Sequence, residues 1–155
     1  VPITDLKRVL ELLSNINISK MSIVEIADII RPALVGLLIQ KICPINKELS
    51  VITLSPEMEQ IIINALKEKN TTGISLDPTF TKNMLKAIAQ AYETTSSKGD
   101  NCILLTSTII RKDLANLIRQ NIEDLHVLAF TELPETRRIN IIATIENKLQ
   151  EENNK

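Results

Sequence analysis

Three times along the chain, a short apolar run ends at a serine or an aspartate, and a helical pattern starts directly behind it. The three stretches are VITLSPEMEQ (51–60), ISLDP (74–78) and ILLTS (103–107). Serine and aspartate are favoured at helix N-caps, and proline is favoured in the first helical turn. We therefore expect strand-to-helix junctions capped by Ser55, Asp77 and Ser107. The spacing of the three junctions differs, so they do not form an internal repeat.

A strand that runs into a helix can also present backbone N–H groups to a phosphate. Phosphate-binding junctions usually add glycines, which let the backbone approach the ligand, and often a lysine. The first junction has no glycine, Pro56 lacks an N–H group, and the carboxylates of Glu57 and Glu59 would repel an anion. Capping is therefore the preferred interpretation. A small α/β domain that binds nucleotide or phosphate is the alternative.

The N-terminal part of the chain has helical patterns. Four apolar residues at helical spacing predict an amphipathic helix over 4–14: Leu6, Val9, Leu10 and Leu13. Ser22 and Glu25 match a capping box, so Ser22 is expected to cap a second helix that ends before Pro44. Pro32 predicts a kink or a break inside this helix. The run ALVGLLI (33–39) is apolar nearly all round, which implies burial on several sides.

These elements divide the chain near residue 72. Residues 1–72 are expected to form a small, mainly helical unit with a strand at 48–54. Residues 73–146 are expected to form an α/β unit with a four-stranded sheet, and 147–155 are a polar tail. The four strands are expected at 74–76, 102–105, 126–130 and 139–145, the last with alternating apolar residues and one buried face. A loop is expected at 94–101, TTSSKGDN. The fold class is therefore α+β or α/β.

Composition narrows the functions open to the chain. Its net charge is −1 and its aromatic content is 2%, which disfavours nucleic-acid binding because that needs basic surface and stacking rings. Its longest apolar run, 33–39, is far shorter than the about 20 residues of a membrane-spanning helix. His126 is the only histidine, and Cys43 and Cys102 form no CxxC pair. We expect no catalytic residue, no metal and no cofactor, hence a binding or assembly module and not an enzyme.

The junction segments also carry a family resemblance. Together with VPITDLKRVLELL (1–13), five segments occur in a familiar order: ELSVITLSPEMEQ (48–60), ISLDP (74–78), ILLTS (103–107), DLHVLAFTELPE (124–135) and INIIATI (139–145). In this order they resemble the C-terminal cytoplasmic region of the large export-gate protein of bacterial type III secretion, the FHIPEP family. The family has a flagellar and a virulence-injectisome branch, and the motifs do not separate the two.

The resemblance implies a longer parent protein with an N-terminal membrane domain and four cytoplasmic subdomains. Residues 1–72 match the third subdomain, the main ring-building element, and 73–146 match the peripheral fourth. The implied assembly is a nonameric ring at the cytoplasmic face of the inner membrane, where other export proteins and chaperone–substrate complexes dock. Where relatives carry polar or basic residues in the second helix, this chain has Val35-Gly36-Leu37-Leu38, so polar ring contacts there are not carried over.

Self-association has its own expected surface. The outer face of the first helix carries four charged residues, and the apolar run of the second helix adds a leucine: Asp5, Lys7, Arg8, Glu11 and Leu37. Charges of this kind register subunits more than they add affinity. Because association costs several kcal/mol before any net gain, we expect the chain to be monomeric or weakly associating in dilute solution. Rings are expected when it is concentrated or tethered.

Overall fold

The computed structural model describes residues 3–16, 20–67 and 76–147. In chain order, the described elements are α1 (Ile3–Ser14), α2 (Ile23–Ile42), β1 (Leu49–Leu54), α3 (Pro56–Lys67), α4 (Pro78–Ser96), β2 (Cys102–Thr106), α5 (Thr108–Arg119), β3 (His126–Ala129), the 3-10 turn η2 (Phe130–Glu132) and β4 (Ile139–Ile145). This is a mixed α/β fold, as the sequence predicts. No helix in the described ranges is long and apolar enough to cross a membrane.

The four strands form one parallel sheet with the order β3-β2-β1-β4. A four-stranded sheet was predicted, but one of its four strands differs from the predicted set. β1 lies at its centre and pairs with both β2 and β4, although the sequence placed it in the helical unit. The strand expected at 74–76 has no described counterpart, because Leu76 lies outside any strand and 74–75 are not described. The division near residue 72 also falls outside the described residues and stays a prediction.

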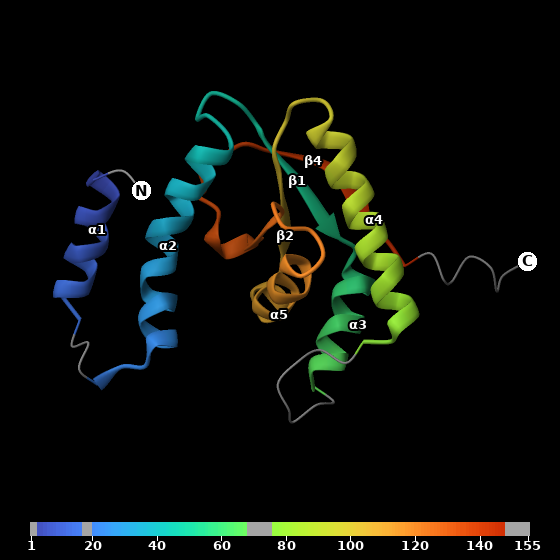
Figure 1. The fold of residues 1–155 in the computed structure, drawn as a ribbon, viewed down its shortest axis with the longest axis horizontal. Coiled ribbons are helices and arrows are strands. Elements are labelled where there is room, and N and C mark those ends of the chain that lie inside the picture. The colour runs from blue at the N-terminus through green and yellow to red at the C-terminus, as the bar shows by residue number, and fades with distance from the viewer. Residues whose placement is uncertain (1–2, 17–19, 68–75, 148–155) are drawn as a thin grey trace, which may run out of the picture.

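Helices cover both faces of the sheet (Figure 1). On one face, α3, α4 and α5 pack through fully buried side chains such as Ile62, Met84 and Leu114. On the other face, Val35 and Ile39 of α2 pack against a second cluster: Leu49 and Val51 of β1, Ile103 and Leu105 of β2, and Leu128 of β3. The apolar run 33–39 is therefore core on the side of α2 that meets the sheet.

The connection from β3 to β4 has to cross the whole sheet, because these strands form its two edges. It includes η2, and Leu133 packs into the core cluster on the α2 face. Arg137, near its end, donates from Nη2 to the backbone carbonyls of Cys43 (2.7 Å) and Pro44 (2.8 Å), just beyond the end of α2. The crossover is thus held against α2 by an apolar and a polar contact.

α1 and α2 form an antiparallel hairpin, in which α1 packs against α2 and lies at one end of the molecule (Figure 1). α2 runs without interruption from Ile23 to Ile42 and includes Pro32. The break predicted at this proline is therefore absent. A proline removes one backbone donor and its intrahelical bond, and burial of Val35 and Ile39 on the following turns offsets that loss.

One boundary and one burial pattern differ from the predicted ones. α4 extends to Ser96, so the loop expected at 94–101 starts later. The hydroxyls of Thr94 and Thr95 donate to the carbonyls of Gln90 and Ala91, four residues back, which satisfies them inside a helix. In the turn that follows the helix, Gly99 adopts a φ of 80°, a conformation that glycine adopts without steric cost.

The second difference is in β4. Ile139 and Ile141 are exposed, whereas Ile145 is buried. A register shift against β1 between Val51 and Ile52 changes which residues face the core halfway along the strand. The simple alternation with one buried face that the sequence predicts is therefore wrong for this strand.

Candidate assembly interface

Three of the predicted caps lie at helix starts and make the expected type of bond. Ser22 and Glu25 form a capping box at α2: Ser22 N–H donates to Glu25 Oε2 (2.7 Å), and Glu25 N–H donates to Ser22 Oγ (3.3 Å). The hydrogen bonds from the Ser22 backbone and side chain hold the pKa of Glu25 below its ordinary value. Met58 N–H donates to Ser55 Oγ (3.3 Å) at α3.

Asp77 holds the start of α4 in the same way. Its Oδ2 accepts from the backbone N–H of Phe80 at 2.9 Å, and Pro78 follows it directly. The carboxylate of the chain itself thus lies where an anionic ligand of this helix terminus would bind. The arrangement is structural and satisfies the Phe80 N–H group in the first turn of α4.

Ser107 does not act as the sequence predicts. It precedes α5 at the N-cap position, but its side chain makes no capping bond. Instead Glu59, from the first turns of α3, accepts at Oε1 from Ser107 N–H (2.9 Å) and from Thr106 Oγ1 (3.0 Å). A carboxylate 48 residues away in sequence therefore replaces the local hydroxyl. It also fills the anion position at the start of α5, which argues against phosphate binding there.

The predicted charged surface lies partly on described residues. Lys7 and Glu11 are exposed on the outer side of α1, and Lys7 Nζ is 3.9 Å from Glu11 Oε1. An exposed pair of this kind contributes about 0–1 kcal/mol. The side chains of Asp5 and Arg8 lie outside the described structure. Leu37 is half-buried, and because two residues advance a helix by about 200°, it projects nearly opposite the core residue Val35, away from the sheet.

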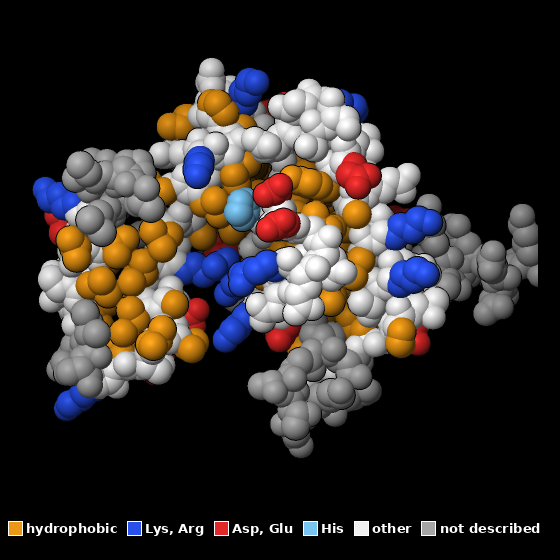
Figure 2. Space-filling model, viewed as in Figure 1, with side chains coloured by type: hydrophobic (Ala, Val, Ile, Leu, Met, Phe, Trp, Pro, Cys, Tyr) orange, Lys and Arg blue, Asp and Glu red, His pale blue; other side chains and the backbone are white. Residues whose placement is uncertain are grey.

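A different part of α2 exposes apolar side chains. Ile23, Ala27 and Leu34 recur at intervals of four and seven residues and therefore share one side of the helix; we call them the α2 stripe. Ile23 is 86% exposed and Leu34 is 42% exposed, and Ala27 is also exposed. On α1, Leu10 is 55% exposed. Figure 2 shows hydrophobic side chains gathered over this hairpin. The helical spacing of Ile23, Ala27 and Leu34 could have indicated the stripe, but the sequence does not say which side of an almost wholly apolar helix is left uncovered.

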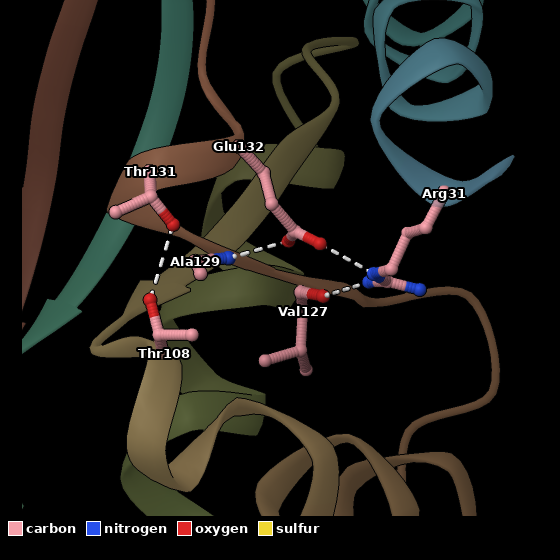
Figure 3. A network of polar contacts seen from close by, with 6 residues as sticks. All are labelled: Arg31, Thr108, Val127, Ala129, Thr131 and Glu132. Carbon is pink, nitrogen blue, oxygen red and sulfur yellow. Dashed lines mark hydrogen bonds and ion pairs between the residues drawn. The ribbon is translucent and has the colours of Figure 1, made fainter. Parts of the chain in front are cut away.

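A polar network joins α2 to the sheet (Figure 3). Arg31 Nε donates to Glu132 Oε1 in η2, and Arg31 Nη2 lies 3.5 Å from the carbonyl oxygen of Val127. Glu132 Oε2 also accepts from the backbone N–H of Ala129 at 2.8 Å. The side chains of Arg31 and Glu132 are 31% and 13% exposed, so the ion pair is partly shielded from solvent. Sequence reasoning did not find this contact, because its partners are 101 residues apart.

An open groove of about 970 Å³ lies between α4 and the edge strand β4. Small side chains on both elements leave this space: Ala87, Ala91 and Ala143. Its lining includes the positively charged Lys86 and Lys98 and the negatively charged Asp100 and Glu146. The groove is therefore neither a strongly charged nor a strongly apolar ligand site.

The residues with the most reactive side chains do not converge. Cys43 and Cys102 are free and buried in different core clusters, and burial raises the pKa of the Cys102 thiol to about 11. His126 is exposed at the start of β3. Among the described residues, no group of three His, Cys, Asp or Glu side chains is placed to hold a metal ion.

The model of the FHIPEP family matches residues 1–138 of the chain. Similar proteins include the flagellar biosynthesis protein FlhA of Buchnera aphidicola subsp. Acyrthosiphon pisum, 31% identical over 147 residues, or 93% of this chain and 21% of FlhA. The invasion protein InvA of Salmonella typhimurium is 25% identical over 146 residues, or 94% of this chain and 21% of InvA. The chain thus spans about a fifth of the length of these relatives.

Solved structures share the fold. The CdsV chain in the complex of Chlamydia pneumoniae CdsV and CdsO aligns with a TM-score of 0.73 at 27% identity, over 94% of this chain and 43% of the matched one. The nonameric SctV-C of EPEC, seen by cryo-EM, aligns with a TM-score of 0.71 at 18% identity, over 94% and 44% of the two chains. At 18% identity, the second likeness is one of fold alone.

Proposed function

The chain belongs to the FHIPEP family, and from this premise we propose that it is a cytoplasmic assembly and docking module of a bacterial type III protein export gate. In this role it forms part of a homo-oligomeric ring below the export channel, at the cytoplasmic face of the inner membrane. Export-apparatus proteins and chaperone–substrate complexes dock on that ring. Both the flagellar and the virulence branches are represented among its relatives, by FlhA and by InvA.

The observation that carries the assembly part of this proposal is the α2 stripe. A side chain that is 86% exposed, as Ile23 is, contributes almost no burial to the isolated fold. Covering a large aliphatic side chain is worth about 1.5–3 kcal/mol. The stripe lies on a hairpin at one end of the molecule, so a neighbouring subunit can reach it without disturbing the sheet (Figure 1).

The ring itself is supported by the nonameric assembly of a protein with the same fold. The docking of other export proteins is supported by the complex of CdsV with CdsO, in which a protein 27% identical to this chain holds a partner. Chaperone–substrate docking rests on family membership alone. The whole gate is much longer than this chain, so membrane attachment is proposed to come from another part of the parent protein.

The role is proposed to be non-enzymatic and to need no cofactor. The nucleotide- or phosphate-binding alternative is weaker for a physical reason. Two of the three helix starts that suggested it already hold a carboxylate of the chain: Asp77 at α4 and Glu59 at α5. The third follows Ser55 and begins with Pro56, which lacks an N–H group, and Glu57, which repels anions.

The test is a density-dependent association measurement. The chain carries an N-terminal histidine tag, is attached to nickel-lipid vesicles, and is labelled for energy transfer between copies. We expect little association in solution at micromolar concentration by sedimentation, and association on vesicles that rises with surface density. Ile23→Glu and Leu34→Glu should each abolish the vesicle signal while circular dichroism stays unchanged.

Ile45→Glu is the matched control, because Ile45 is 78% exposed and lies outside the hairpin, in the turn before β1. It should leave association unchanged. An absence of association at every surface density would contradict the assembly role. Equal loss in all three variants would mean that the α2 stripe is not the contact surface.

A further inference from the structure

α2 is fastened firmly at its C-terminal end. The carbonyl of Ile42 accepts from Asn101 Nδ2 at 3.2 Å, and the carbonyls of Cys43 and Pro44 accept from Arg137 at 2.7 and 2.8 Å. Val35 and Ile39 are buried against the sheet in the same half of the helix. This half therefore cannot move without breaking both polar and apolar contacts.

The N-terminal half of α2 has no comparable support. From Ile23 to Ile29, its side chains are exposed or half-buried. This half lies beyond the sheet beside the C-terminal part of α1, whereas the start of α1 lies beside the fastened half (Figure 1). Residues 23–31, with the adjoining C-terminal part of α1, form an arm that projects from the fastened half. Pro32 stands at the junction, and its missing N–H group leaves the carbonyl of Asp28 without its intrahelical partner. The helix is thus weakest where the arm begins.

Arg31 holds the arm at this same point. Its guanidinium forms an ion pair with Glu132 and lies 3.5 Å from the Val127 carbonyl oxygen (Figure 3). Among the interactions described, it is the polar side-chain contact that joins the arm to β3 and η2. The Glu132 carboxylate is held in place, since it also accepts from Ala129 N–H at 2.8 Å.

The 3-10 turn that carries Glu132 is braced from a second side. Thr131 Oγ1 in η2 lies 3.1 Å from Thr108 Oγ1 in the first turn of α5. The pair between Arg31 and Glu132 therefore connects a weakly supported arm to a turn that is tied both to β3 and to α5. A contact with one loose and one fixed partner can set the orientation of the loose one.

We propose that the ion pair between Arg31 and Glu132 is a latch that sets the orientation of the α1–α2 arm, and that its opening lets the arm pivot at Pro32. Its consequence for assembly rests on the proposed function: a head-to-tail contact closes into a ring only at one rotation between subunits. Because the α2 stripe lies largely on this arm, the latch then determines whether copies of the chain close a ring or form open arcs.

The test measures the arm in the monomer, so it does not depend on ring formation. Spin labels on Ser14→Cys, at the tip of the hairpin, and Lys82→Cys, on α4, report the arm; labels on Gln40→Cys and Lys82→Cys report the fastened half. Both native cysteines are buried, and protein without introduced cysteines gives the labelling background. Pulsed electron paramagnetic resonance on dilute protein measures the distance distribution of each label pair.

Arg31→Gln removes the guanidinium and its charge and leaves a shorter polar side chain. The arm from residue 23 to 31 is about 12 Å long at 1.5 Å per residue, so a pivot of about 20°, the size of a sharp kink, moves its end by about 4 Å. We expect the distribution for Ser14 and Lys82 to shift or widen by about this amount. The distribution for Gln40 and Lys82 should stay unchanged.

Glu132→Gln should produce the same change, and the double variant should add nothing further, because both changes open one contact. Arg119→Gln, at an exposed arginine on α5, is the matched control and should change neither distribution. Unchanged Ser14–Lys82 distances in both latch variants would overturn the proposal. So would equal widening of both label pairs, since that would mean general loosening; if one variant fails to fold, the other decides.

Discussion

The contact between Glu59 and the start of α5 gives the sharpest test of how this sheet is held together. Glu59 Oε1 accepts from Ser107 N–H at 2.9 Å and from Thr106 Oγ1 at 3.0 Å, and Thr106 is fully buried. Glu59→Ala leaves both donors without this acceptor. Hydrogen bonds to a charged group contribute about 1.5–3 kcal/mol each, and removing one partner of a buried bond adds a desolvation cost.

Some of that cost is recovered, because water can enter beside a half-buried residue. We therefore expect Glu59→Ala to lower the free energy of unfolding by about 3 kcal/mol, measured by urea denaturation. For a domain of this size, that corresponds to a fall in melting temperature of roughly 6–12 °C. Glu59→Gln keeps one carbonyl oxygen as acceptor and loses the charge, so its cost should be about 1 kcal/mol.

Glu57→Ala is the matched control. Glu57 lies in the same first turn of α3 but is exposed, so it keeps only the favourable interaction with the helix dipole, about 0.3–1 kcal/mol. If Glu59→Ala costs no more than Glu57→Ala, the carboxylate does not hold α5 and the reasoning is refuted. Added phosphate should restore part of the stability of Glu59→Ala only, since the anion position is then vacant.

Three further predictions concern the helix caps, the buried thiol and the chain division. Ser22→Ala and Asp77→Ala should each lower the unfolding free energy by about 0.5–2 kcal/mol in urea; a loss below the error of the measurement in both would contradict the capping bonds. The pKa of Cys102 is raised to about 11 in the folded state, above its ordinary value. The stability that the neutral thiol contributes to the folded state is therefore present below about pH 9 and is lost as the pH rises towards 11. Cys102→Ala should reduce the fall in unfolding free energy at high pH. Part of the fall should remain, because the pKa of Tyr92 is also raised. Limited proteolysis should cut first at 70–73 or within 97–101; early cuts inside 108–119 would count against this arrangement of helices and loops.

Local elements were largely predictable from the sequence. Ser22 with Glu25, and Asp77 with Pro78, satisfy backbone groups within a few residues of themselves, so their partners are already visible in the sequence. The runs at 49–54, 102–106 and 126–129 are strands for the same reason: side-chain type and the neighbouring residues decide local backbone preference. The resemblance to the export-gate family was also readable, since it depends on the order of these same segments.

Contacts between segments that are far apart in the chain could not be predicted from the sequence. Glu59 replaces Ser107 as the acceptor at α5, and Arg31 meets Glu132, because the parallel sheet brings together the ends of elements that are far apart in the chain. β1 became a central strand for a related reason: an unpaired buried strand would leave its backbone groups unsatisfied, and β2 and β4 supply the partners.

The sequence alone therefore determined where most helices and strands begin, the local caps at Ser22, Ser55 and Asp77, and to which family the chain belongs. Only the tertiary structure decided the strand order, the reversal of exposure along β4, and which side of the apolar helix α2 remains uncovered. The physical reason is the range of the interactions. Caps and turns are settled within one helical turn, whereas burial depends on which surfaces meet after the chain has crossed the sheet, and a helix that is apolar nearly all round gives no local signal of its free side.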